Sequence, residues 1–176
     1  MSAAISSCEV RALKYLAESV AANTGSCWAV LTSAEEIANK QDLSLVSFGL
    51  TSNRKTVELL DNVANPFVRY EHPRFVTKLT GRTVVRASQV EDCGAIIKIH
   101  PSNLPDRTWI CCGGFGEWGT SGAAWYLTRK WRDIRSKFGK RPFVIFVQVK
   151  PDRDESAEPI IMAATPEELE RQARGD

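Results

Sequence analysis

Three glycines, at positions 114, 116 and 119, have the spacing of glycine-rich turns that hold phosphate groups. The apolar run at 108–112 predicts a strand before them, and a helical pattern follows from residue 120. Glycine leaves room for an anion beside the backbone, and a helix N-terminus offers N–H groups and partial positive charge. We therefore expect a phosphorylated small molecule to bind here, with Trp118 stacking on a base. The predicted ligand-binding residues of this turn are Gly114, Gly116, Trp118, Gly119, Thr120 and Ser121. The alternative is a tight turn that only lets the helix pack closely on the sheet.

Residues 45–56 repeat the same order of strand, glycine, small polar residues and helix. Two such turns in a parallel sheet face one crevice at the carboxyl ends of the strands. Gly49, Ser52 and Asn53 are therefore further predicted ligand-binding residues. The alternative is that Ser52 or Asn53 merely caps the helix.

Glu117 is the only acidic residue inside the glycine-rich turn, which makes it the candidate catalytic carboxylate. Either histidine, His72 or His100, could form a nucleophile–base pair with the adjacent cysteines 111 and 112. Those cysteines end a predicted buried strand, where thiols usually pack as small hydrophobes. The spacing of cysteines and histidines predicts no metal site, and we expect no cofactor. NAD is not expected, because the glycines lie late in the chain and no acidic residue ends the next strand.

Periodicity and turn signals divide the chain into helices and strands. Helices are predicted over 8–22, 34–39, 54–63, 120–138 and 166–174, and strands over 27–31, 43–48, 93–99, 108–112, 143–149 and 160–163. The acidic stretch at 152–158 is predicted to be a loop, and residues 67–86 one or two hairpins. Strands and helices alternate, so the predicted fold is one Rossmann-like α/β domain over residues 1–176. It would have a mainly parallel sheet, helices on both faces and a hairpin insertion near residues 67–86.

Composition excludes several classes of function. The chain has 23 basic and 21 acidic residues, and this near balance argues against a dedicated nucleic-acid-binding surface. No apolar run reaches the roughly 18–20 residues of a membrane span, and the N-terminus lacks a signal-peptide pattern. The five cysteines show no disulfide pattern, which favours a reduced, cytoplasmic protein without membrane or nucleic-acid partners.

The two strand–glycine–helix turns, the hairpin region and Ile97-Lys98-Ile99-His100-Pro101 follow an order that resembles the SLOG and TIR-like sensor modules of prokaryotic signalling and defence systems. The resemblance covers roughly residues 25–150. It implies a Rossmann-like fold that recognises or processes a nucleotide-derived ligand. In enzymes of that group a carboxylate acts at the N-glycosidic bond, and Glu117 would inherit that role.

Three hypotheses follow. The first is a binding or sensor module for a nucleotide-like small molecule, acting as a homo-oligomer or with a signalling partner protein. The alternative is an enzyme that cleaves or transfers at the N-glycosidic bond of a nucleotide. A second alternative is a protein-interaction module whose glycine-rich turn is purely structural.

Overall fold

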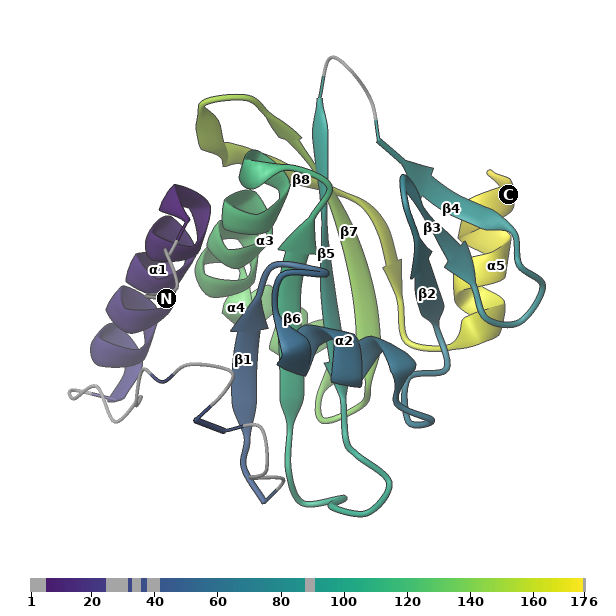
Figure 1. The fold of residues 1–176 in the computed structure, drawn as a ribbon, viewed down its shortest axis with the longest axis horizontal. Helices are drawn as coiled ribbons and strands as arrows, with labels where there is room; N and C mark the ends of the chain where they lie inside the picture. Colours follow the sequence, from purple (N-terminus) through teal and green to yellow (C-terminus); the bar gives the residue numbers. More distant parts are fainter. Residues whose placement is uncertain (1–5, 25–31, 33–35, 38–41, 88–90, 176) are drawn as a thin grey trace.

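A five-stranded sheet in the order β1-β6-β5-β7-β8 forms the centre of the computed structural model, which describes residues 6–24, 32, 36–37, 42–87 and 91–175 (Figure 1). A separate three-stranded sheet has the order β2-β3-β4. The elements, in chain order, are α1 (Ser7–Thr24), β1 (Leu45–Phe48), α2 (Arg54–Asp61), β2 (Val68–Glu71), β3 (Arg74–Thr77), β4 (Thr83–Arg86), β5 (Asp92–Ile99), β6 (Trp109–Gly114), α3 (Glu117–Arg129), α4 (Trp131–Phe138), β7 (Phe143–Lys150), β8 (Arg153–Ala163) and α5 (Pro166–Arg174).

The prediction of a mainly parallel, Rossmann-like sheet is wrong. Only β1 and β6 are parallel, whereas β6–β5, β5–β7 and β7–β8 pair antiparallel. The connections explain the difference, because parallel neighbours need a long crossover. Residues 100–108 join β5 to β6 without a helix, and a two-residue turn, in which Asp152 has a φ of 61°, joins β7 to β8.

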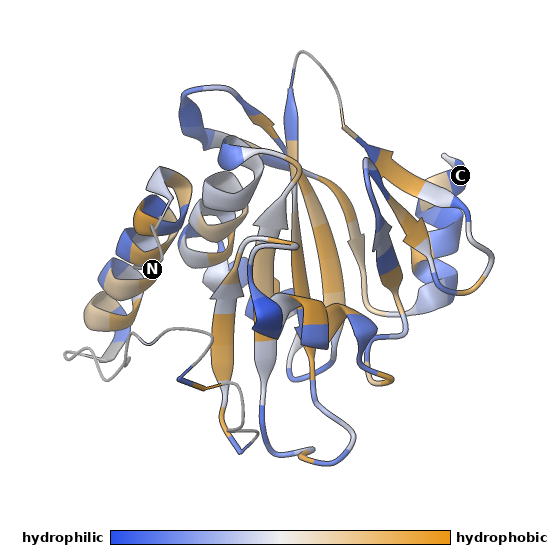
Figure 2. Ribbon diagram, in the orientation of Figure 1, coloured by the Kyte–Doolittle hydropathy of each residue, from blue (hydrophilic) through white to orange (hydrophobic). Residues whose placement is uncertain are grey.

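Both faces of the central sheet are covered, and the side chains of neighbouring residues in one strand pack on opposite faces. Ile96 and Cys112 pack in the core beneath α1, α3 and α4. Ile97 and Cys111 pack in the other core, against α2, α5 and the three-stranded sheet. Figure 2 shows the hydrophobic colour concentrated along the central strands. The period-two alternation of strands therefore places both cores on one sheet.

Several predicted elements are confirmed and two need correction. The hairpin region forms β2, β3 and β4, and the C-terminal helix begins at Pro166 with Thr165 as its cap. The predicted helix over 120–138 is two helices, α3 and α4, separated at Lys130. One cause is Thr128, whose hydroxyl donates to the carbonyl oxygens of Ala124 and Trp125 and so competes with the backbone ladder.

The acidic stretch at 152–158 is the other correction, because it is largely strand. β8 runs from Arg153 to Ala163 along the edge of the sheet, with Asp154 and Ala157 buried and Glu155 and Glu158 exposed. Exposed acidic residues on an edge strand look like a loop in the sequence. The predicted strand over 27–31 lies outside the described residues, as does most of the predicted helix over 34–39, of which residues 36–37 form a turn.

Candidate functional site

The two strand–turn–helix segments lie side by side, as their sequence order suggests. β1 and β6 are parallel neighbours with Phe48 opposite Cys112, and the Gly49 N–H donates to the Cys112 carbonyl at 3.0 Å. After β1 the chain enters α2 on one face of the sheet, and after β6 it enters α3 on the other. Ligands of open α/β sheets bind at such switch points, outside the carboxyl ends of the strands. We call this place the β1–β6 edge.

The glycines of the second turn provide space rather than unusual dihedral angles. None of Gly114, Gly116 and Gly119 has a positive φ. A Cβ atom on Gly119 would lie 2.4 Å from the Cys93 carbonyl oxygen, and one on Gly94 would lie 2.1 Å from the Gly119 carbonyl oxygen. The absent side chains therefore let the start of α3 rest directly on β5, which is the structural alternative considered for this turn.

The backbone N–H groups that were expected to bind a phosphate donate instead to a carboxylate of the protein itself, that of Asp92. Asp92 Oδ1 accepts from the N–H groups of Gly116 at 3.0 Å and Cys93 at 2.8 Å. Asp92 Oδ2 accepts from the Gly119 N–H at 2.7 Å. The partial positive charge at the start of α3 thus stabilises Asp92, which lies at the first position of β5.

The hydroxyl groups of Thr120 and Ser121 point into the protein. Thr120 Oγ1 accepts from the Gly114 N–H at 3.0 Å, and Ser121 Oγ donates to Asp154 Oδ1 at 2.5 Å. Both side chains are buried. They stabilise the turn and the contact of α3 with β8.

Trp118 is half-buried beneath α1. The Arg11 guanidinium lies 4.2 Å from the centre of its ring, and Arg11 Nε bonds Asp154 Oδ2 at 3.1 Å. The Tyr15 hydroxyl donates to the same carboxylate oxygen at 2.9 Å, and burial together with this bond raises the pKa of Tyr15 to about 12. α1 is thus held against α3 and β8 by a polar cluster that includes the tryptophan expected to stack on a base.

The first turn has a different construction. Gly49 has a φ of +83°, a left-handed conformation that favours glycine. Asn53 is the N-cap of α2, and its side chain accepts from the Lys55 N–H at 2.9 Å. Capping is therefore what Asn53 does in the structure. Ser52 and Arg54 are exposed beside it.

Glu117 is exposed at the start of α3, and Ser7 Oγ of α1 lies 3.4 Å from both of its carboxylate oxygens. A Cβ atom on Gly49 would lie 3.3 Å from Glu9 Oε1, so the first turn of α1 reaches the other side of the edge as well. With Asp92, these residues place three carboxylates around the β1–β6 edge.

Phe115 gives this edge an aromatic wall. Its ring lies 6.1 Å from that of Tyr70 and 5.5 Å from that of Phe75, centre to centre. The glycine-rich turn therefore contacts the three-stranded sheet as well as β5.

No nucleophile–base pair forms among the described residues. The ring nitrogens of His100 face the carbonyl oxygens of Arg107 and Lys140, and His72 Nδ1 lies 2.9 Å from the Tyr70 hydroxyl. Burial raises the pKa of the Cys111 thiol to about 12 and that of Cys112 well above its ordinary value. Across the described ranges, no group of three or more histidine, cysteine or acidic side chains is placed to hold a metal ion.

Sequence reasoning missed Asp92, Arg11, Asp154 and Glu9. Asp92 had a detectable signal: Gly94 interrupts an otherwise apolar strand, which indicates close approach of another backbone segment. The other three lie on α1 and β8, far from the turns in the sequence, and only the packing of these elements brings them together.

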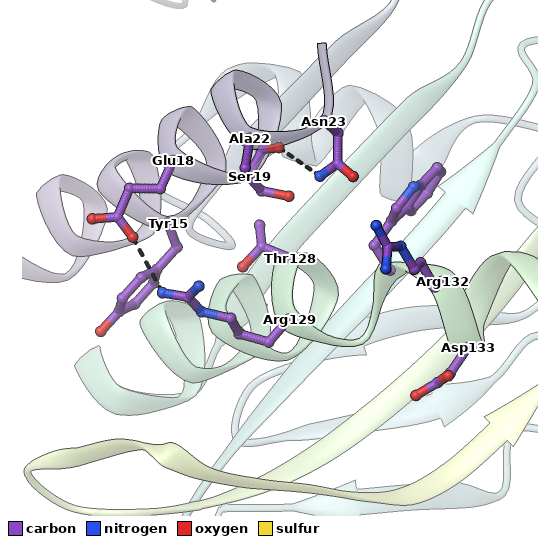
Figure 3. A pocket seen from close by; sticks show the side chains of 10 residues that line it. Tyr15, Glu18, Ser19, Ala22, Asn23, Thr128, Arg129, Arg132 and Asp133 are labelled. Carbon is purple, nitrogen blue, oxygen red and sulfur yellow. Dashed lines mark hydrogen bonds and ion pairs between the residues drawn. The ribbon is translucent and has the colours of Figure 1, made fainter. Parts of the chain in front are cut away.

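The first turn of α1 partly covers the β1–β6 edge. Two surface hollows lie away from this edge. One, of about 360 Å³, lies between α1 and the junction of α3 with α4 (Figure 3). The other, of about 370 Å³, lies at the β2–β3 hairpin and is lined by Glu71, His72, Pro73, Arg74 and Arg86. None of the helices in the described part combines the length and apolar character of a membrane span.

Comparisons of the chain with protein families, with curated proteins and with solved structures gave no match. The resemblance to SLOG and TIR-like modules therefore stays a prediction, and the parallel sheet that it implied is absent.

Proposed function

We propose that this protein is a small-molecule-binding module that recognises a nucleotide or nucleotide-derived molecule at the β1–β6 edge. The observation that carries the proposal is the switch point: β1 and β6 are parallel neighbours, and the helices that follow them cover opposite faces. Each turn there brings exposed residues to the same edge, Thr51 and Ser52 from the first turn and Gly116 from the second.

The two turns would contact different parts of the ligand. Asp92 already bonds the N–H groups of Gly116 and Gly119, and the exposed Glu117 adds negative charge at the start of α3, so a phosphate is repelled from this side. Sugar hydroxyls suit it, because carboxylates accept their hydrogen bonds. A phosphate suits the other turn, where the exposed Ser52 precedes the N-cap and the exposed Arg54 begins α2, with the single carboxylate of Glu9 beside Gly49.

We favour a binding module over an enzyme that cleaves the glycosidic bond of its ligand. Glu117 is exposed, and its side chain contacts Ser7 at 3.4 Å rather than a positioned acid or base. A glycosidic-bond enzyme needs its working carboxylate held beside the reacting carbon. We therefore expect Glu117→Gln to leave nucleotide binding unchanged or slightly tighter, because the amide oxygen of Gln still accepts a hydrogen bond from a sugar hydroxyl and one negative charge near the phosphate is removed.

A thermal-shift comparison of adenosine, adenosine monophosphate and NAD tests the proposal. A ligand at about 100 times its dissociation constant adds about 2.7 kcal/mol of stability. In Arg54→Gln we expect the response to the monophosphate to fall to the level of adenosine, while the adenosine response is kept. Arg171→Gln removes an equally exposed charge from α5 and serves as the matched control.

Absence of a stabilising response to every one of these compounds in the wild type would overturn the proposal. Release of nicotinamide from NAD by the wild type, lost in Glu117→Gln, would replace binding by the enzymatic hypothesis.

A further inference from the structure

The end of α3, α4 and the turn into β7 carry concentrated positive charge. In residues 129–141, Asp133 is the sole acidic side chain, and every basic side chain is exposed. The basic residues are Arg129, Lys130, Arg132, Arg135, Lys137, Lys140 and Arg141, which together we call the α4 basic surface. Because the whole chain has a formal net charge of only +2, the rest of the chain is net acidic. The near balance of the whole sequence therefore conceals a local positive field.

Most of this charge is not used inside the protein. Arg129 pairs with Glu18 of α1 at 3.2 Å, and Arg141 donates to backbone carbonyl oxygens. Among the described residues, no carboxylate lies within ion-pair distance of Lys130, Arg132 or Lys140, nor of Arg135 or Lys137. Basic residues in a last helical turn complement the helix dipole, but Arg132 and Lys140 lie outside those turns.

A hollow of about 360 Å³ borders this surface, between α1 and the α3–α4 junction. Its lining combines aromatic rings, guanidinium groups, neutral hydrogen-bonding groups and two carboxylates: Tyr15, Trp131, Arg129, Arg132, Ser19, Asn23, Thr128, Glu18 and Asp133 are among them. Figure 3 shows Ser19 and Thr128 approaching from the two helices, with Arg129 extended across to Glu18. Trp131 is 36% exposed. These groups are suited to stacking on a flat ring and bonding its edges.

We propose that the α4 basic surface binds a single-stranded nucleic acid, with phosphates along α4 and one base in the bordering hollow. Proteins that bind single strands combine a positive track for the backbone with aromatic platforms for the bases. The eight residues of α4 extend over about 12 Å at 1.5 Å per residue, enough for a few nucleotides.

A single-stranded nucleic acid fits the basic surface and its hollow better than a duplex or an anionic membrane does. A duplex keeps its bases paired and cannot place one in the hollow. An anionic membrane would use an apolar helix face, but the apolar residues Ile134 and Phe138 of α4 are buried in the core.

Fluorescence anisotropy with labelled oligouridylate and oligothymidylate, each about 20 nucleotides long, tests the proposal on the full chain. We expect binding that weakens from about 50 to 200 mM salt. The triple variant Arg132→Gln, Arg135→Gln, Lys137→Gln should bind at least about tenfold more weakly, with a salt slope reduced by about 2, since each lost phosphate contact lowers it by about 0.7. Trp131→Ala should weaken binding about tenfold without changing the slope.

The matched control is Arg86→Gln, Lys150→Gln, Arg171→Gln, which removes the same charge from exposed positions elsewhere and should retain wild-type affinity. Equal weakening in both triple variants would show non-specific attraction and overturn the proposal. So would the absence of salt-dependent binding to either oligonucleotide, and so would binding to phosphatidylserine vesicles without binding to the oligonucleotides.

Discussion

The two strand–glycine–helix turns look alike in the sequence but are held by different forces. At the first turn, Gly49 adopts a left-handed conformation and Asn53 caps α2 with its own side chain. At the second, the glycines have ordinary dihedral angles, and a carboxylate from another strand, Asp92, caps α3. The first turn is closed by local interactions, and the second by a contact between residues far apart in the sequence.

This difference shows that a glycine motif has more than one physical cause. A phosphate-binding turn and a tightly packed turn both need glycine, because in each case a side chain would collide with something. At the second turn, the partner that approaches is the backbone of β5. Each of the following variants tests one part of the comparison.

Gly119→Ala should have the largest effect. Its Cβ would lie 2.4 Å from the Cys93 carbonyl oxygen, so α3 must shift away from the sheet. We expect a loss of about 3 kcal/mol in the free energy of unfolding, measured by urea denaturation. Gly49→Ala is the counterpart: its φ of +83° costs about 1–2 kcal/mol, and its closest contact is the rotatable Ser52 hydroxyl at 2.6 Å. Equal losses at both positions would contradict the distinction.

Asp92→Asn should come next. The amide retains the shape but replaces one accepting oxygen by an NH₂ group, which faces an N–H donor. We expect a loss of about 2 kcal/mol, as for hydrogen bonds to charged groups. Asp106→Asn, at an exposed loop position, is the matched control and should change stability by less than about 0.5 kcal/mol. A similar small change in Asp92→Asn would mean that the carboxylate does not hold the turn.

Asn53→Ala should cost about 1 kcal/mol, because the Lys55 N–H loses its side-chain acceptor. Asn53→Asp retains an acceptor and should stay near the wild type. Thermal unfolding of the three proteins gives the comparison, and a loss that is equal in both variants would show that the amide has a role other than capping.

Treatment of the native protein with iodoacetamide should have the smallest effect of these tests, because the thiols of Cys111 and Cys112 are buried. Burial raises the pKa of the Cys111 thiol to about 12 and that of Cys112 well above its ordinary value, so both stay protonated at neutral pH. Because thiolate is the reactive form, we expect no alkylation of their peptide by iodoacetamide in the native state, as read by mass spectrometry. Rapid modification of the folded protein would restore the nucleophile hypothesis.

Local signals in the sequence predict most of the individual elements. Thr165 and Pro166 predict the start of α5, and the β-branched run of β7 predicts a buried strand. Strand direction was not predictable in this way. It depends on whether the connection after a strand turns back to form an antiparallel neighbour or crosses the sheet to form a parallel one. The helix-free segment 100–108 before β6 is the one local signal of antiparallel pairing, because it is too short for a crossover helix.

The candidate site was predicted in part. Adjacent turns at the carboxyl ends of parallel strands follow from the repeated pattern, and β1 and β6 confirm this arrangement. The role of Asp92 was not predicted. Asp92 begins β5 whereas Gly116 follows β6, and only the antiparallel pairing of these two strands brings the two residues together. Charge balance over the whole sequence likewise conceals the α4 basic surface, because averaging removes the spatial separation of charge.

A nitrogen-15 NMR titration with adenosine monophosphate tests the central claim most directly. If the β1–β6 edge binds the ligand, amide shifts should change at Gly49, Ser52 and Arg54 and at Gly114 to Glu117, and they should saturate together. Changes confined to the hollow between α1 and α4, or none at millimolar nucleotide, would contradict the claim that this edge is the binding site.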